Sequence, residues 1–259
     1  MKRYLVLLSY FVVSLTQITI TAQAQEKVYR EIQSLQQLPG IVNEINAKIK
    51  GTNGKIYIGF DLDNTITKIN GCNLPLREGQ TTLAVLKGLV NNKNVRIFII
   101  TSRSPNPQAG QDLKAFRQNL HTSLFANLIA YITNVFGSNI FGDSLIGEKL
   151  ADADTKSISS QNYTIDNTFT YYEGGIISVP GLGDQKIHNK GRALRGIINN
   201  KVIDFDPQND YLVFVDNNKS HINEAQDYLG DKVNLYTLYF PQIPELAIAK
   251  GDKCTATID

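Results

Sequence analysis

The chain has 259 residues, of which 26 are basic and 24 acidic, so its formal net charge is only +2. A nearly neutral chain without basic blocks gives no electrostatic reason to expect a nucleic acid or an anionic membrane surface as partner. Its length suits one α/β domain with a modest insertion, because a domain commonly takes ~100–200 residues.

The first 24 residues have the pattern of a signal peptide. A short basic start precedes an apolar run over 5–13, and small residues stand at Ala22 and Ala24, the two positions that a signal peptidase reads. Cleavage is therefore expected before Gln25. The alternative, a membrane anchor, needs about 20 mostly apolar residues, whereas polar residues interrupt this run. Removing residues 1–24 takes away two basic residues and no acidic one, which brings the formal charge to zero. We therefore expect an exported bacterial protein, periplasmic or secreted, with no membrane attachment after cleavage.

Hydrophobic periodicity predicts the elements that follow. Over residues 25–50, apolar residues recur at helical spacing on either side of Pro39, which predicts two short helices. A compact apolar run over 55–60 predicts a strand buried on both faces, because strands of parallel sheets lack the polar alternation of half-exposed ones. The other predicted elements, in chain order, are a helix around 83–90, a strand over 95–100, a helical region over 108–136, a loop or small flap within 150–167, β structure over 171–179, a helix over 191–198, a strand over 211–215, a helix over 221–228 and a strand over 233–240.

The alternation of apolar strands with helices predicts a Rossmann-like parallel sheet covered by helices on both faces. We expect residues 25–259 to form one such α/β domain, with at most a small cap or lid inserted at about 138–170. Two cysteines, Cys72 and Cys254, leave a disulfide open. An exported protein can keep one, but the sequence does not give the separation of their Cα atoms.

Polar residues follow three of the predicted strands at the point where each strand ends. In open parallel sheets, ligands bind beyond the carboxyl ends of the strands, so these residues are expected to converge on one small region. They are Asp61 and Asp63, Thr101 and Ser102, and Asp216 and Asn217.

Asp61 and Asp63 are the first candidates for chemistry. Two carboxylates in close quarters resist ionisation unless a cation lies between them, and magnesium suits such a site because it prefers hard oxygen ligands. With the metal present, Asp61 is placed to attack phosphorus, and Asp63 is placed to act as acid and then base. The alternative is a polar turn that caps a helix, where Asp and Asn are favoured.

Further residues are candidates for binding a phosphoryl group or the metal. The hydroxyls of Thr101 and Ser102, with adjacent N–H groups, can hold phosphate oxygens, although the same residues also suit a helix N-cap. Lys190 can neutralise charge on a transferred phosphoryl group, whereas a lysine in a polar loop is more commonly solvated. Asp216 and Asn217 can complete a metal shell, or else they form a strand-to-helix turn.

The ordered set of motifs resembles the phosphatase branch of the haloacid dehalogenase superfamily. The motifs are Phe60-Asp61-Leu62-Asp63-Asn64-Thr65 after one strand, Ile100-Thr101-Ser102-Arg103 after the next, Asn189-Lys190-Gly191 opening a helix, and Val215-Asp216-Asn217-Asn218 after the last core strand. The resemblance covers about residues 56–240. The segment 171–229 is also similar to a group of uncharacterised exported bacterial proteins assigned to that superfamily.

The resemblance implies a HAD-like core and a role for each motif residue. Asp61 would be the nucleophile that forms an aspartyl-phosphate, and Asp63 would be the acid–base residue. Thr101, Ser102 and Lys190 would bind the phosphoryl group.

The resemblance also implies that Mg²⁺ is held by Asp61, by Asp63 through its backbone carbonyl, and by the fourth motif. Many relatives carry two acidic residues where this chain has Asp216 and Asn217. Two assignments therefore stay open. Either Asn217 is the metal ligand while Asp216 orients Lys190, or Asp216 is the ligand.

The expected function is a magnesium-dependent, exported phosphomonoester hydrolase that acts on a phosphorylated small molecule, with nucleotides among the candidates. Asp63 disfavours the dehalogenase branch, which lacks an acid–base carboxylate at that place. The alternative is a non-catalytic protein that keeps the fold and holds a partner in the crevice or on a flanking surface. Asn217 and the polar stretch over 151–167 suggest that second reading. The sequence leaves the oligomeric state open.

Overall fold

The computed structural model describes residues 25–68, 76–102, 164–165, 168–169, 171–173, 176–179, 190–199 and 203–241. The predictions that lie outside these residues are the signal peptide over 1–24, the helical region over 108–136, most of the lid over 138–170, and the pairing of Cys72 with Cys254. Within the described residues, no helix is long and apolar enough to cross a membrane.

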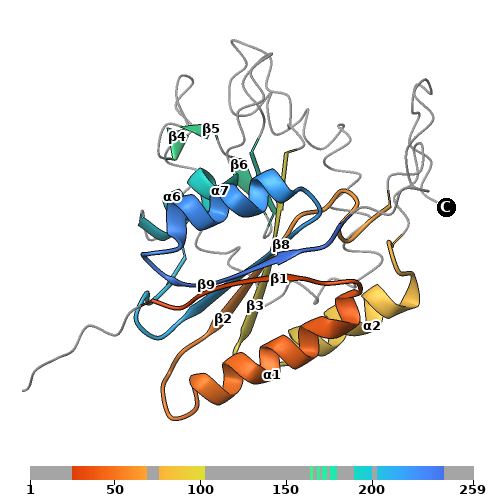
Figure 1. Cartoon of the computed structure of the whole chain (residues 1–259), viewed down its shortest axis with the longest axis horizontal. Helices are drawn as coiled ribbons and strands as arrows, with labels where there is room; N and C mark the ends of the chain where they lie inside the picture. The colour runs from red at the N-terminus through yellow and green to blue at the C-terminus, as the bar shows by residue number, and fades with distance from the viewer. Residues whose placement is uncertain are drawn as a thin grey trace, which may run out of the picture.

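A seven-stranded sheet forms the centre of the described part of the chain (Figure 1). Its order is β1-β9-β8-β2-β3-β7-β6, and every neighbouring pair is parallel except β6 with β7. The strands are β1 (Lys27–Glu31), β2 (Ile56–Phe60), β3 (Val95–Thr101), β6 (Tyr171–Glu173), β7 (Ile176–Ser178), β8 (Tyr211–Asp216) and β9 (Asn234–Tyr239), and a separate antiparallel pair joins β4 (Thr164–Ile165) to β5 (Thr168–Phe169). The predicted α/β architecture with a parallel sheet is confirmed.

The strand order places a topological switch point beside β2. When β2, β3, β7, β8 and β9 are counted in chain order, they stand in the order 3-2-1-4-5 across the sheet, which is Rossmann-like. The chain runs outward in one direction from β2 through β3, and in the other direction from β8 through β9. Ligands of such sheets bind beyond the carboxyl ends of the strands at this point. A ligand-binding site is therefore expected at the residues that follow β2 and β8.

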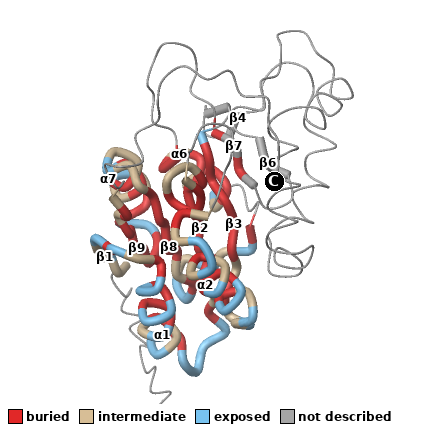
Figure 2. The backbone as a smooth tube through the Cα atoms, turned by 90° about the vertical axis from the view of Figure 1, so that its right-hand side faces the viewer, coloured by how far each residue is buried: buried red, intermediate tan, exposed pale blue. Residues whose placement is uncertain are grey.

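Helices cover both faces of the sheet (Figure 1). Helices α1 (Leu38–Lys48) and α2 (Gln80–Val90) lie on one face, and α6 (Lys190–Asn199) and α7 (Lys219–Leu229) lie on the other. Each helical layer is joined to the sheet by its own buried apolar cluster, so the interior of Figure 2 is red on both sides. Strand β2 contributes to both clusters because alternate side chains point to opposite faces: Ile58 faces α1 and α2, and Tyr57 faces α6 and α7.

The segment over 25–50 differs from the predicted pair of helices. Its first part is strand β1, which pairs in parallel with β9, and a short 3-10 helix (Leu35–Gln37) then leads into α1. Pro39 lies in the first turn of α1, where its missing N–H is not needed, rather than between two helices. The prediction was wrong because β1 is stabilised by a distant strand, with Lys27 paired to Leu235. The local spacing of apolar residues carries no information about that partner.

Helices α6 and α7 approach each other closely at Gly191. A Cβ atom added to Gly191 would lie 2.6 Å from the backbone oxygen of Glu224 in α7, which is closer than real Cβ contacts come. Glycine therefore permits a helix contact that any other residue would push apart. The contact matters because Gly191 follows Lys190, the first residue of α6, which lies at the carboxyl edge of the sheet.

We expect Gly191→Ala to lower the free energy of unfolding by ~1–3 kcal/mol, because the added methyl group overpacks a backbone contact. The matched control is Gly88→Ala in α2, where the added Cβ would meet nothing within 4 Å. That control should be neutral or stabilise the protein by ~0.5–1 kcal/mol, because alanine favours the helix. Urea denaturation of both variants tests this, and equal effects would contradict the close packing of α6 on α7.

Candidate functional site

Strand register brings the carboxylates of Asp61 and Asp216 side by side. Phe60 of β2 is paired with Val215 of β8, so Asp61 and Asp216 are the next residues on their strands and point to the same face, the one that α6 and α7 cover. Neighbouring strands lie ~4.8 Å apart. Both residues are buried, with exposed fractions of 5% and 0%. Two carboxylates at this spacing repel each other, so the arrangement requires a cation.

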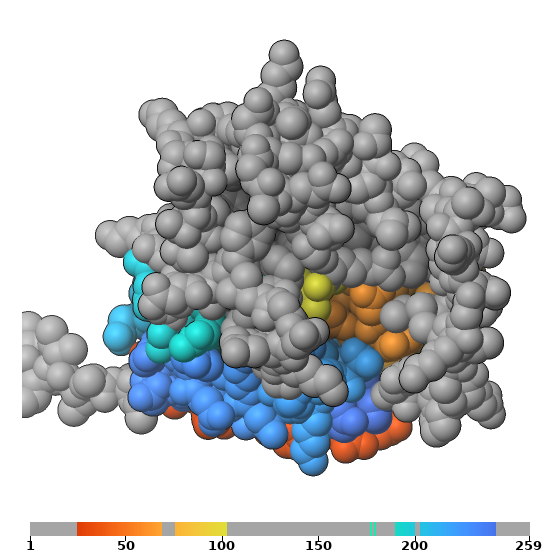
Figure 3. Space-filling view, turned by 90° about the horizontal axis from the view of Figure 1, so that it is seen from above, coloured from red at the N-terminus to blue at the C-terminus, as the bar shows by residue number. Residues whose placement is uncertain are grey.

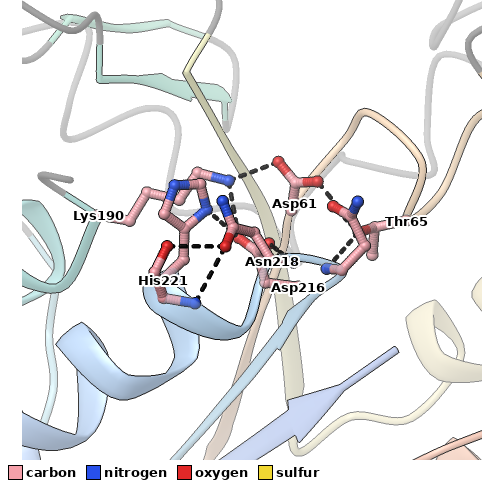
Figure 4. Close-up of polar contacts among 8 residues, drawn as sticks. Asp61, Thr65, Lys190, Asp216, Asn218 and His221 are labelled. Carbon is pink, nitrogen blue, oxygen red and sulfur yellow. Dashed lines mark hydrogen bonds and ion pairs between the residues drawn. The ribbon is translucent and has the colours of Figure 1, made fainter. Parts of the chain in front are cut away.

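Lys190 supplies one positive charge between the two carboxylates (Figure 4). Its Nζ lies 2.5 Å from Asp61 Oδ1 and 2.8 Å from Asp216 Oδ2, and the residue is only 1% exposed. Burial acts to lower the pKa of Lys190, but the two carboxylates outweigh burial and raise the pKa above its ordinary value. Lys190 is therefore charged. A single lysine cannot neutralise both carboxylates, and the buried group keeps an excess of negative charge when both are ionised.

The two carboxylates share that excess unequally. Burial raises the pKa of Asp61 to about 7, and the charge of Asp216 adds to the increase, although Lys190 opposes it. Burial also acts to raise the pKa of Asp216, but Lys190 and His221 outweigh it, so the pKa of Asp216 lies below its ordinary value. Asp216 is thus the permanent counter-ion of Lys190. Asp61 is the carboxyl group that resists ionisation, and a further cation would favour its charged form.

Both oxygens of Asp216 are occupied by donors. Oδ1 accepts a hydrogen bond from the backbone N–H of Asn218 at 2.7 Å, and Oδ2 accepts from Lys190. The Nδ1 atom of His221 lies 3.0 Å from the same Oδ2. This geometry favours the assignment in which Asp216 orients Lys190 over the one in which Asp216 binds a metal.

Oxygen atoms gather on the other side of Asp61. Thr65 Oγ1 donates to Asp61 Oδ2 at 3.0 Å and accepts from the backbone N–H of Asn217 at 3.1 Å, which ties the segment after β2 to the end of β8. The side-chain oxygen of Asn217 faces Asp61 Oδ2 and the backbone oxygen of Asp63, each 3.1 Å away. Three acceptors that face one another need either a cation among them or an amide turned by 180°, whose nitrogen would donate to both.

A cation at this place would be held by mixed oxygen ligands. Within the described residues, no cluster of three or more His, Cys, Asp and Glu side chains could hold a metal ion. The facing oxygens come instead from one carboxylate, one amide and one backbone carbonyl. Such a ligand set suits a hard cation such as Mg²⁺, and it does not suit zinc or other metals that prefer imidazole or thiolate.

The other predicted residues lie at the same edge of the sheet. Thr101 ends β3, is fully buried, and its backbone oxygen accepts a hydrogen bond from Val179 at 2.8 Å. Ser102 follows it and is exposed. Asp63, whose backbone oxygen faces Asn217, is half-buried. The phosphate-binding roles of Thr101 and Ser102 and the acid–base role of Asp63 stay predictions.

Sequence reasoning assigned no role to Thr65 or His221. Thr65 comes four residues after Asp61, close enough in a tight turn for the two side chains to meet, so the spacing could have indicated the contact. His221 stands in the first turn of α7, where Asn218 caps the helix by accepting from the backbone N–H of Ser220 at 3.0 Å. Helical geometry turns His221 back toward the strand end, and that contact depends on how α7 packs.

The site lies where two halves of the chain meet. In the view from above (Figure 3), atoms of the N-terminal half in orange and yellow lie beside atoms of the C-terminal half in blue.

Comparisons of the chain with protein-family models, with curated proteins and with solved structures found no significant match. The residues and geometry of the site therefore carry the functional argument by themselves.

Proposed function

We propose that the protein is a Mg²⁺-dependent phosphomonoester hydrolase of the haloacid dehalogenase superfamily, acting through an aspartyl-phosphate on Asp61. The observation that carries the proposal is the buried group Asp61–Lys190–Asp216 at the switch point of a Rossmann-like sheet. A buried carboxyl group whose pKa is raised, beside a specific charge partner, is a candidate for a functional site. The order of the motifs along the chain supports the same branch.

The facing oxygens of Asp61, Asp63 and Asn217 fit a magnesium ion. Ligands of octahedral Mg²⁺ lie ~2.1 Å from the ion, so adjacent ligands lie ~3 Å apart. The oxygen of Asn217 is 3.1 Å from each of its two neighbours. Asn217 would then be the ligand from the fourth motif, with Asp216 left to orient Lys190. The bound ion supplies positive charge that favours ionised Asp61 and offsets the charge of the phosphoryl group.

The side chains then divide the reaction between them. A carboxylate oxygen of Asp61 bonds to phosphorus while the bond from phosphorus to the alcohol oxygen breaks, and Asp63 gives its proton to the departing alcohol. Asp63 next takes a proton from a water molecule, whose oxygen attacks phosphorus and breaks the bond to Asp61. Phosphate leaves, and both carboxyl groups return to their starting states. Lys190 keeps Asp61 oriented and attracts the phosphoryl oxygens.

The alternative is a non-catalytic protein that binds a partner in the crevice or on a flanking surface. One contact favours it: Lys190 lies 2.5 Å from Asp61 Oδ1 and occupies an oxygen that a nucleophile needs. An amide at Asn217, in place of a second carboxylate, also weakens the attraction for a cation. Ligand binding without turnover, unchanged by a chelator, is the result that this alternative expects.

Substrate class and location belong to the same proposal. Residues 1–24 act as a signal peptide, and the protein from Gln25 onward works in the periplasm or outside the cell. The substrate is a phosphorylated small molecule, nucleotides included, because the segment over 66–79 is too short for a large cap. A small lid at about 138–170 would then shape the entrance.

Phosphate release tests the proposal. The purified protein from Gln25 onward is incubated with a panel of phosphomonoesters, with Mg²⁺, with EDTA, and with EDTA followed by excess Mg²⁺. We expect turnover that EDTA abolishes and Mg²⁺ restores, because burial raises the pKa of Asp61 to about 7 and a bound cation would favour its ionised form and offset the charge of the phosphoryl group. No release from any substrate, or release that EDTA leaves unchanged, would contradict the phosphatase assignment.

A further inference from the structure

The segment that carries Asp63 is a tight turn. It folds around the backbone oxygen of Leu62, which accepts from the N–H of Ile66 at 3.1 Å and from the N–H and the hydroxyl of Thr67 at 3.0 Å and 3.1 Å. Within it, Asn64 has φ 60°, in the left-handed region that asparagine adopts more readily than most residues other than glycine. Contacts from outside the turn can therefore help to fix its conformation.

Arg77 provides that support from both its backbone and its side chain. Its N–H donates to the oxygen of Ile66 at 2.8 Å, and its Nη1 donates to the oxygen of Asn64 at 2.5 Å. The same Nη1 donates to the oxygen of Phe240 at 3.0 Å, and Nη2 donates to the oxygen of Pro241. The guanidinium also lies 3.4 Å from the centre of the Phe240 ring. Arg77 therefore fastens the turn after β2 to the carboxyl end of β9.

The chemistry of these contacts requires arginine. Arg77 is only 4% exposed, and in the described part of the chain its hydrogen bonds go to neutral backbone oxygens. Burial removes hydration from the guanidinium and so lowers its pKa. A planar fork can span oxygens from two separate segments, whereas the ammonium of lysine is a single point. A buried cation of this kind is expensive to maintain, so the geometry that it holds is expected to matter.

The contacts of Arg77 affect the position of Asp63. The two peptides that flank Asn64 each have a contact, because the Asn64 oxygen accepts from Arg77 and the Asp63 oxygen faces Asn217. A rotation at Asn64 would shift the backbone of Asp63 relative to Asn217, which its oxygen faces. We propose that Arg77 is a positioning residue that holds Asp63 where it protonates the leaving alcohol. This role rests on the proposed phosphatase activity.

Two substrates with different leaving groups test the role. 4-Nitrophenyl phosphate releases a phenolate that needs no proton near neutral pH, whereas glycerol phosphate releases an alcohol that does. The value of kcat/KM reports the step up to formation of the aspartyl-phosphate, in which Asp63 acts as acid. For Arg77→Lys we expect kcat/KM to fall ~10–100-fold on glycerol phosphate and less than ~3-fold on 4-nitrophenyl phosphate, since general acid catalysis contributes ~10²–10⁴-fold.

Two further variants serve as a positive reference and a matched control. Asp63→Asn removes the acid itself and should show the same selectivity between substrates more strongly. Arg96→Lys is the matched control, because Arg96 also donates to two backbone oxygens, at 3.0 Å and 2.9 Å, but from the amino-terminal end of β3. It should change kcat/KM little on either substrate. If Arg77→Lys fails to fold, Arg77→Gln carries the same comparison, because its amide keeps two donors.

The outcomes separate the two claims. An active wild-type protein whose Arg77→Lys variant loses equal activity on both substrates, or none, would overturn the positioning role and leave the phosphatase intact. A wild-type protein that releases phosphate from neither substrate would contradict the proposed function itself. Selective loss on glycerol phosphate, shared with Asp63→Asn, is the result that supports the role of Arg77.

Discussion

Asp61→Asn is expected to reduce Mg²⁺-dependent phosphate release by at least ~10⁴-fold, as removal of a catalytic nucleophile commonly does. The substitution keeps the size of the side chain, and its oxygen can still accept from Lys190. It removes the negative charge and the nucleophilic oxygen together, so no aspartyl-phosphate can form. Initial rates on 4-nitrophenyl phosphate measure the loss. Acid-quenched wild-type protein should carry phosphate on the peptide that contains Asp61, and the variant should carry none.

The matched control is a second buried aspartate at the other end of the sheet. Asp210 is 3% exposed, precedes β8, and accepts from the backbone N–H groups of Lys55 at 2.6 Å and Asp206 at 2.8 Å. Burial raises the pKa of Asp210 as well. Asp210→Asn should retain most of the activity per folded molecule. Equal rates for wild type and Asp61→Asn would show that Asp61 is not the nucleophile, or that a contaminant releases the phosphate.

Lys190→Met is expected to lower the free energy of unfolding by ~3–5 kcal/mol, because it leaves two buried carboxylates without their shared cation. The contacts at 2.5 Å and 2.8 Å to Asp61 and Asp216 are both lost. The effect is a large part of the ~5–15 kcal/mol that stabilises a typical domain. Urea denaturation in EDTA gives the value free of metal binding. The loss should grow as the pH is raised above about 7, because Lys190 acts to lower the pKa of Asp61 and the variant needs a higher pH to ionise both carboxylates.

Two comparisons assign the loss to charge rather than to helix disruption. Lys219→Met changes the exposed first residue of α7, as Lys190→Met changes the buried first residue of α6, and it should stay within ~0.5 kcal/mol of wild type. Adding Asp216→Asn to Lys190→Met should recover part of the lost stability, since residues in one network are not additive. A Lys190→Met protein as stable as wild type would mean that the buried ion pairs do not form.

The place of each core strand could be read from the chain. The runs over 55–60, 95–100, 211–215 and 233–240 correspond to β2, β3, β8 and β9, because strands buried on both faces are continuous apolar segments. The polar residues that end them are local features too. That Asp61 and Asp216 would lie at one edge therefore followed from two simple facts: the strands are parallel, and both residues come directly after or at a strand end.

The sequence alone did not predict the structure or contacts of residues whose partners lie far away in the chain. Strand β1 was predicted as a helix because its pairing with β9 is invisible in local spacing. The buried contacts of Arg77 reach Phe240 and Pro241, and nothing in the sequence around Arg77 distinguishes it from a solvated arginine. The sequence predicts His221 only as a polar residue of a helix, and its contact with Asp216 depends on the packing of α7.

The sequence by itself determined which side chains are available at the carboxyl edge of the sheet, because burial pattern and strand ends are written in consecutive residues. Only the tertiary structure decided how those side chains divide their roles. Lys190 lies between two carboxylates, one of them 129 residues away. Asp216 is occupied by Lys190 and His221, so the amide of Asn217 is the side chain of the fourth motif that is left facing Asp61. Such choices depend on distances of a few ångströms between separate elements, which only the packing of α6 and α7 on the sheet sets.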